Sequence, residues 1–177
     1  PPPPPPPFQA EDGIRDSVNG LVGSEMCIRD SDSSAAALDI ARHNASVHQL
    51  ENIRFVHGKW LEPLTDLDFD LIISNPPYVA TDDPHLAEGD VRYEPATALA
   101  SGKRGMDAIT HLTSHAGQRL KAGGWLIVEH GYDQQQPVYD CFKQGGFEDI
   151  VQLTDLAGQP RVTAGRHGKS RHAKSRA

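Results

Sequence analysis

Apolar positions along this chain recur at two spacings, and the two spacings alternate along the sequence. Leu38, Ala41 and Ala45 recur at helical spacing, whereas Phe69 to Ser74 is a short, mostly apolar run of the length of a strand. The pattern predicts helices at 33–49, 106–121 and 133–145, strands at 53–57, 69–74, 125–130, 147–154 and 160–166, and a long loop at 75–104. Helices that alternate with strands in this way predict a parallel α/β sheet.

The predicted strand at 69–74 runs directly into the tetrapeptide Asn75-Pro76-Pro77-Tyr78. In open α/β sheets the carboxyl ends of the strands face the ligand, so we expect this tetrapeptide at the binding edge. The two prolines have a fixed φ and no N–H, and the backbone therefore presents carbonyl oxygens to the site. A pocket built in this way accepts hydrogen bonds.

A pocket of hydrogen-bond acceptors suits a planar NH2 group. The lone pair of an amide or aromatic amine nitrogen is delocalised, and accepting hydrogen bonds from both of its N–H groups returns electron density to the nitrogen. We expect the Asn75 side-chain oxygen and the Pro76 carbonyl to be the acceptors and the Tyr78 ring to fix the plane of the group. The tetrapeptide thus predicts methylation of an amide or amine; a plain loop after a strand is the alternative.

Several stretches between Leu71 and Arg166 resemble one family of methyltransferases. They are Ser74 to Val79, Asp83 to Leu86, Gly89 to Pro95, Ala98-Leu99, Gly123 to Leu126, Glu129 to Gly131, Asp155 to Gly158 and Arg161-Val162. These stretches are similar to the peptide chain release factor glutamine methyltransferases, the PrmC/HemK family. Many amine methyltransferases share the tetrapeptide, including those that act on DNA, so the signature from Asp83 to Pro95 is the more specific evidence.

The resemblance implies a Rossmann-like, class I α/β fold and a reaction. The reaction is methyl transfer from S-adenosylmethionine to the side-chain amide nitrogen (N5) of the glutamine in a Gly-Gly-Gln loop of a release factor. Carried over by position, Asn75, Pro76, Pro77 and Tyr78 bind the glutamine amide. Asn75, Pro76 and Tyr78 are then the catalytic residues, and Asn75 also lies beside the sulfonium end of the cofactor.

Two residues further upstream belong to the predicted cofactor site. Asp32 stands where the family has the acidic residue that binds the ribose hydroxyls, as carboxylates do in other nucleotide sites; a helix N-cap is the alternative. Trp60 matches an aromatic position that borders the adenine, and a half-buried Trp without a ligand is the alternative. Glu129 and His130 end a predicted strand at the ligand edge, where they either line the pocket or serve the structure.

The glycine-rich loop with which such enzymes bind the cofactor has no counterpart in this sequence. Residues 1–31, where we expect it, open with seven prolines, lack helical or strand periodicity and resemble a translated sequencing adapter. We therefore expect a non-native, disordered leader at 1–31, a partial catalytic domain at 32–166 and a basic, disordered tail at 167–177. Without the family's first strand and glycine loop, the fragment is expected to be inactive and the strand at 69–74 to have an unpaired edge.

Charge narrows the possible substrates. The chain has 17 Lys and Arg against 24 Asp and Glu, a net charge of −7, whereas binding to nucleic acid phosphates needs a basic surface. Methylation of adenine N6 or cytosine N4 in nucleic acid is therefore the second hypothesis. A non-catalytic α/β fragment is the third. We expect release factors as partners and no specific binding of nucleic acid.

Cysteine and histidine spacing bears on compartment and metals. Cys27 and Cys141 have no metal or redox spacing and suit a reducing cytoplasm. His111 and His115 are one helical turn apart but have no third ligand nearby in the sequence, so no metal site is predicted. No apolar run reaches the length of a membrane span. We expect a cytoplasmic monomer that does not bind membranes.

Overall fold

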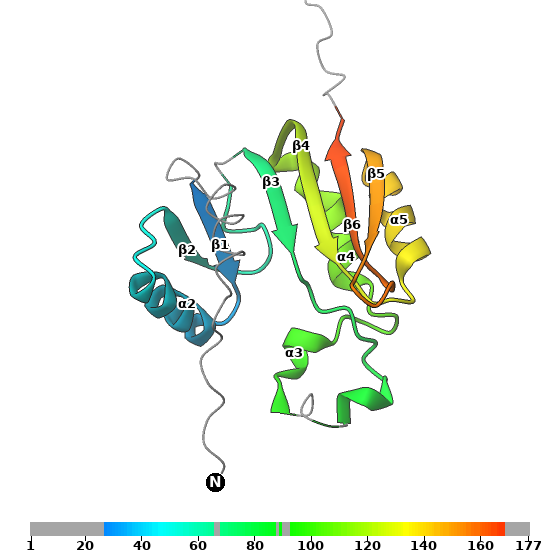
Figure 1. Ribbon diagram of the computed structural model, residues 1–177, viewed down its shortest axis with the longest axis horizontal. Coiled ribbons are helices and arrows are strands. Elements are labelled where there is room, and N and C mark those ends of the chain that lie inside the picture. Colours follow the sequence, from blue (N-terminus) through cyan, green and yellow to red (C-terminus); the bar gives the residue numbers. More distant parts are fainter. Residues whose placement is uncertain (1–26, 66–67, 88, 90–92, 169–177) are drawn as a thin grey trace, which may run out of the picture. The chain divides into compact units, whose positions relative to one another are not determined.

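The computed structural model describes residues 27–65, 68–87, 89 and 93–168. The chain divides into two compact units, Pro1–Pro63 and Leu64–Ala177, and each is described here by itself (Figure 1).

The first unit is a strand, a helix and a strand. Strand β1 (Ile28–Asp32) pairs in parallel with β2 (Ile53–His57), and the helix α2 (Ala35–Val47) connects them. Leu38 and Ala45, which recur at helical spacing, are the buried residues of α2. The helix is two residues shorter at each end than the predicted 33–49.

The helix α2 begins where a serine side chain replaces a missing backbone partner. The Ser34 hydroxyl accepts a hydrogen bond of 3.2 Å from the Ala37 N–H, one of the N–H groups that have no partner within the helix. The N-cap of α2 is therefore Ser34. The alternative prediction that Asp32 is the N-cap is wrong.

Ser34→Ala should lower the free energy of unfolding of the first unit by about 1 kcal/mol, because the Ala37 N–H loses its acceptor. Urea unfolding followed by the NMR signal of the Trp60 indole would measure this. Ser33→Ala is the matched control, since the Ser33 side chain makes no hydrogen bond among the described residues. Equal losses in the two variants would contradict the capping role.

The predicted leader at 1–31 needs correction at its end. Residues Ile28 to Ser31 form most of β1, and their pairing with β2 is extended by hydrogen bonds from Ile28 N–H to the Asn52 carbonyl and from Gly58 N–H to the Asp32 carbonyl. Four of the five residues of β1 are polar, so the strand is held by backbone pairing and gives no apolar pattern. Residues 1–26 of the predicted leader and 169–177 of the predicted tail lie outside the described residues.

The second unit is a four-stranded mixed sheet in the order β3-β4-β6-β5. Strands β3 (Phe69–Ser74) and β4 (Leu120–Glu129) are parallel. Strand β6 (Pro160–His167) is antiparallel to both β4 and β5 (Phe147–Thr154), so this part of the sheet departs from the parallel sheet that the pattern predicts. The helical segments are η1 (Pro84–Ala87), α3 (Ala96–Leu99), α4 (Asp107–His115), η3 (Ala116–Gln118) and α5 (Gln135–Gln144).

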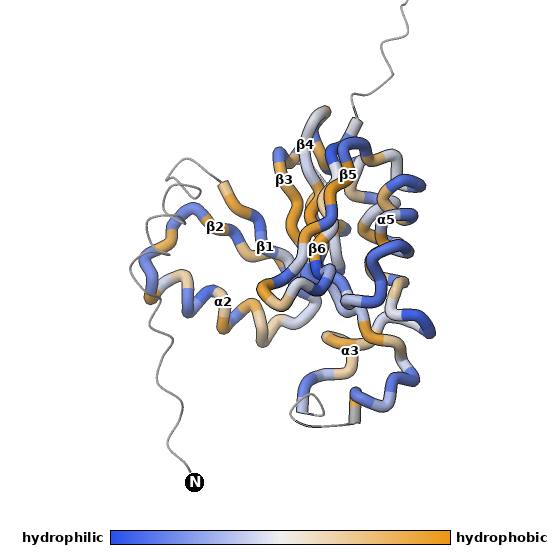
Figure 2. Tube along the Cα trace, turned by 45° about the vertical axis from the view of Figure 1, so that its right-hand side comes forward, coloured by the Kyte–Doolittle hydropathy of each residue, from blue (hydrophilic) through white to orange (hydrophobic). Residues whose placement is uncertain are grey.

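One face of this sheet carries the core. Helices α4 and α5 cover it, and Figure 2 shows apolar positions along β3, β4 and β6. The side chains that are almost fully buried are Ile72, Leu126 and Val128 from the strands and Ile109, Leu112, Val138 and Phe142 from the helices. The opposite face exposes Ile73, Val151 and Leu153. Since successive residues of a strand point to opposite faces, the apolar runs of β3 and β4 supply both faces.

Strand β3 forms one edge of the sheet. Among the described residues it pairs only with β4, as predicted for 69–74 without the family's first strand. Strands 53–57, 69–74 and 147–154 have the predicted bounds. The predicted helix 106–121 was too long, because α4 ends at His115, η3 follows, and β4 begins at Leu120.

Candidate functional site

The tetrapeptide lies at the carboxyl end of β3, where Ser74 pairs with Val128 of β4. Asn75 is exposed, Pro76 is buried, and Tyr78 is half-buried. The chain then forms a short parallel bridge. Val79 N–H donates to the Leu99 carbonyl, and Ser101 N–H donates to the Val79 carbonyl, each at 2.9 Å. Backbone hydrogen bonds therefore hold the chain on both sides of the tetrapeptide, in β3 before it and at Val79 after it.

The two predicted acceptors are unoccupied by the protein's own groups. Among the described residues, neither the Asn75 side chain nor the Pro76 carbonyl takes part in a hydrogen bond. Asn75 is also exposed, so its amide oxygen can reach a substrate. The arrangement supplies acceptors at the edge where parallel sheets bind ligands.

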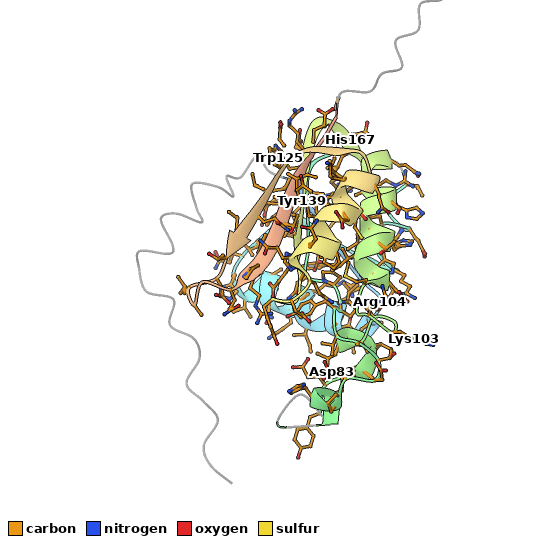
Figure 3. All side chains as sticks on the ribbon, turned by 90° about the vertical axis from the view of Figure 1, so that its right-hand side faces the viewer. Asp83, Lys103, Arg104, Trp125, Tyr139 and His167 are labelled. Atoms are coloured by element: carbon orange, nitrogen blue, oxygen red, sulfur yellow. The ribbon has the colours of Figure 1, made fainter. Side chains whose placement is uncertain are left out.

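A residue that the sequence pattern does not single out binds the same loop. The Gln134 side-chain NH2 donates to the Tyr78 carbonyl at 2.8 Å and to the Arg104 carbonyl at 3.2 Å. Its side-chain oxygen accepts from Gly131 N–H at 2.9 Å. Arg104 lies in the segment between α3 and α4 (Figure 3). Gln134 therefore joins three loops that are distant in the sequence.

The two residues predicted to bind adenosine lie in the first unit. Asp32 is the last residue of β1, and its Oδ1 accepts the Ser34 N–H at 2.7 Å. Trp60 is half-buried with a φ of 52°, and its carbonyl accepts the Ser31 hydroxyl at 2.9 Å. This hydrogen bond joins the turn at Trp60 to the end of β1, and Ser31 directly precedes Asp32 in the chain. Asn75 belongs to the second unit.

Comparison with known proteins identifies the family. The "Methyltransferase small domain" family matches residues 21–90. The release factor glutamine methyltransferase of Xylella fastidiosa (strain Temecula1 / ATCC 700964) is 48% identical over 136 residues, which are 77% of this chain and 50% of the relative. The one from Vibrio cholerae is 44% identical over 138 residues, 77% of this chain and 48% of the relative. The chain belongs to the release factor glutamine methyltransferase family.

The chain spans about half the length of these curated relatives. Solved structures show the fold. A methyltransferase from Pyrococcus furiosus has a TM-score of 0.62 at 16% identity, over 86% of this chain and 70% of that one. A ribosomal protein L11 methylase from Lactobacillus delbrueckii subsp. bulgaricus has a TM-score of 0.60 at 16% identity, over 86% and 63%. The predicted Rossmann-like class I methyltransferase fold is confirmed.

The match to the "Methyltransferase small domain" family begins at residue 21, inside the predicted leader at 1–31.

Part of the family signature from Asp83 to Pro95 has a local structural explanation. The Asp83 carboxylate accepts the His85 N–H at 2.9 Å and lies 2.8 Å from His85 Nδ1, at the start of η1. The hydrogen bond from the His85 backbone, and then the one from its ring, lower the pKa of Asp83. Residues 88 and 90–92 of this segment lie outside the described residues.

His130 has a structural role in this member of the release factor glutamine methyltransferase family. Its side chain is fully buried, with Nδ1 at 2.9 Å from the Gly131 carbonyl and Nε2 at 2.9 Å from the Thr163 hydroxyl. A carbonyl can only accept, so Nδ1 carries a proton. Both ring nitrogens are engaged within the protein. For the half-buried Glu129 beside it, both predicted roles remain, lining the pocket or serving the structure at the end of the strand.

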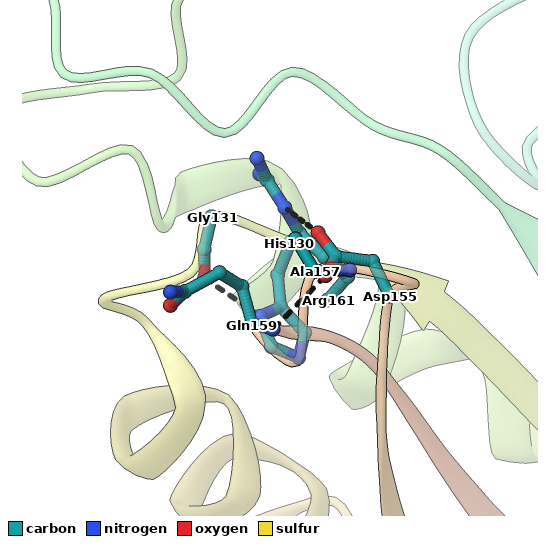
Figure 4. Close-up of polar contacts among 6 residues, drawn as sticks. All are labelled: His130, Gly131, Asp155, Ala157, Gln159 and Arg161. Carbon is teal, nitrogen blue, oxygen red and sulfur yellow. Dashed lines mark hydrogen bonds and ion pairs between the residues drawn. The ribbon is translucent and has the colours of Figure 1, made fainter.

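The turn between β5 and β6 is organised by one carboxylate (Figure 4). Asp155 accepts the Gln159 and Ala157 N–H groups, each at 2.9 Å, and lies 3.5 Å from the Arg161 guanidinium. The Gln159 hydrogen bond, followed by the Ala157 hydrogen bond and Arg161, lowers the pKa of Asp155. These contacts give Asp155, the stretch that follows it and Arg161 a structural role in this turn.

Asp155→Asn should lower the melting temperature at neutral pH, and the difference from the native chain should disappear in acid. The folded-state pKa of Asp155 lies below the unfolded value, so its contribution is present above the unfolded pKa and is lost as pH falls through the folded pKa. Thermal unfolding of both proteins from neutral pH down to pH values below the ordinary carboxyl range would measure this. Asp133→Asn, an exposed carboxylate outside the turn, is the control. A difference in melting temperature that does not change with pH would contradict the stabilising role of the Asp155 carboxylate.

Other candidate sites are weaker. No group of three or more metal-binding side chains occurs within the described ranges. The His111 and His115 rings stack with centroids 4.2 Å apart, and His115 Nδ1 lies 2.8 Å from the His111 carbonyl. No helix in the described part of the chain is long and apolar enough to cross a membrane.

Proposed function

We propose that this chain belongs to the catalytic part of an enzyme that methylates the side-chain amide nitrogen (N5) of the glutamine in the Gly-Gly-Gln loop of peptide chain release factors. The observation that carries the proposal is the Asn75-Pro76-Pro77-Tyr78 loop at the carboxyl end of β3, where the exposed Asn75 side chain and the Pro76 carbonyl make no hydrogen bond among the described residues. The curated relatives bear the corresponding name.

The residues of the first unit fit the adenosine portion of S-adenosylmethionine. Asp32 is exposed at the end of β1, and its second carboxylate oxygen can accept hydrogen bonds from ribose hydroxyls. The Trp60 carbonyl accepts a hydrogen bond from Ser31, which directly precedes Asp32, and the Trp60 ring is the aromatic group proposed to border the adenine. When bound, S-adenosylmethionine supplies a methyl group made electrophilic by its sulfonium.

At the reacting centre the protein's task is to prepare the amide nitrogen. The Asn75 side-chain oxygen and the Pro76 carbonyl accept the two N–H groups of the glutamine and hold electron density on its nitrogen. The Tyr78 ring fixes the amide plane, and such orientation supplies much of the barrier reduction in a bimolecular step. Acceptors that are already in place need no reorganisation during the reaction.

The second candidate is methylation of an amine in nucleic acid by the same loop. The net charge of −7 disfavours it, because binding to a nucleic acid duplex needs a basic groove.

Both Cys27 and Cys141 are free, which supports a reducing compartment. We therefore infer a cytoplasmic, monomeric enzyme whose partner is a release factor.

The test is transfer of labelled methyl groups by the full-length protein to a purified release factor. A release factor in which the Gly-Gly-Gln glutamine is replaced serves as control, and duplex DNA is offered as a competing substrate. Labelling of the native release factor alone supports the proposal. Labelling of DNA and not of the release factor would favour the second candidate.

A further inference from the structure

Gln134 is a buried polar side chain that the methyl transfer described above does not use. It is 8% exposed, and its amide makes hydrogen bonds to Tyr78, Arg104 and Gly131. The Gly105 carbonyl lies at 3.5 Å from the same NH2 group. Buried polar groups that lose their partners are costly, so each of these contacts constrains the loop that makes it.

The position of Gln134 in its helix does not explain its side chain. Gln134 is the N-cap of α5, where a side chain normally accepts a backbone N–H of the first turn. The Gln134 side chain makes no such hydrogen bond. It is turned instead toward the Tyr78 carbonyl, which lies 56 residues earlier in the chain.

The surroundings of the Tyr78 carbonyl are closely packed. Gly105 has a φ of +67°, and a Cβ at this position would overlap the Tyr78 carbonyl oxygen and lie 2.8 Å from Gln134 Nε2. The neighbouring Val79 is fixed by two backbone hydrogen bonds to the segment 99–101. The Tyr78 carbonyl therefore lies close against Gly105 and is held there by the hydrogen bond from the Gln134 amide.

We propose that Gln134 is a positioning residue for the methyl transfer. By holding the Tyr78 carbonyl it sets the backbone of Tyr78, and the backbone sets the direction from which the ring meets the glutamine amide. This inference rests on the proposed function. Because a misplacement of about 1 Å at a reacting centre can cost about 10²-fold in rate, Gln134→Met should lower kcat about ten- to a hundredfold. The KM for S-adenosylmethionine should stay unchanged, since the Gln134 side chain is hydrogen-bonded to Tyr78, Arg104 and Gly131 and not to Asn75, and Asp32 and Trp60 lie in the other unit.

The experiment compares Gln134→Met and Gln134→Glu with Gln136→Met in the full-length protein. Glu keeps the acceptor for Gly131 and loses both donors, which makes it the second variant if Met prevents folding. Gln136 is the matched control, because it is exposed in the first turn of α5 and its side chain binds only Asp140 among the described residues. We expect lower kcat in both Gln134 variants and native kcat in the control.

A second arm separates positioning from a merely structural role. In a Tyr78→Ala background the ring is absent, so Gln134→Met should have little further effect on kcat. An equal loss in both backgrounds, or native kcat in Gln134→Met, would overturn the inference.

A third arm does not depend on activity. In the chain as given, the NMR signals of the Tyr78 ring should shift in both Gln134 variants and not in Gln136→Met; unchanged signals would overturn the inference. If the native enzyme labels no release factor, the proposed function fails, and this arm still decides the contact.

Discussion

Asn75→Ala should lower the turnover of the full-length enzyme about 10²–10³-fold, the usual cost of removing one preorganised hydrogen-bonding group at a reacting centre. The variant leaves the Pro76 carbonyl as the single acceptor for the two amide N–H groups. The Asn75 side chain makes no hydrogen bond with the described residues, so its removal should leave the fold intact. Methyl incorporation into a release factor at saturating S-adenosylmethionine measures the loss.

Two variants of Tyr78 serve as the comparison. Tyr78→Phe keeps the ring and should be milder than Asn75→Ala, whereas Tyr78→Ala should raise KM for the release factor and lower turnover together. Undiminished activity in Asn75→Ala would remove the acceptor mechanism. An unchanged melting temperature in that variant is the control for folding.

The elements that could be predicted from the sequence are those whose apolar pattern matches their burial. Strand β3 places Ile72 in the core and ends at a proline pair, so both its existence and its end have local causes. The tetrapeptide that follows could be placed at a ligand edge because parallel strands fix which edge binds.

Other features have causes that are not local. Strand β1 is mostly polar and is held by backbone pairing with β2, so its apolar pattern does not predict a strand. Gln134 is a weak N-cap by residue type, and its partners Tyr78 and Arg104 lie 56 and 30 residues away. The one local signal was a glutamine at the start of a helix, which has no specific meaning by itself.

The family signature combines chemistry with architecture. Asp83 and Asp155 belong to stretches that match the family, and each accepts backbone hydrogen bonds within its own turn, from His85 to Asp83 and from Ala157 and Gln159 to Asp155. Such contacts lower the pKa of both groups and stabilise the turns that contain them. Asn75 differs, because its side chain is exposed and has no partner among the described residues. This contrast supports the role that we propose for Asn75 in binding the substrate.

Gly105→Ala should lower the free energy of unfolding of the second unit by about 2–5 kcal/mol, the sum of the left-handed backbone cost and an overlap that displaces packed atoms. The overlap is with the Tyr78 carbonyl, which Gln134 holds in place. Gly158→Ala is the matched control, since its φ is +79° and nothing lies within 4 Å of the added Cβ. The control should cost only about 1–2 kcal/mol. Urea unfolding followed by the NMR signal of the Trp125 indole in β4 measures both. Equal losses would mean that the Tyr78 carbonyl moves freely, and the loop would then lack the rigidity on which the positioning of the glutamine amide depends.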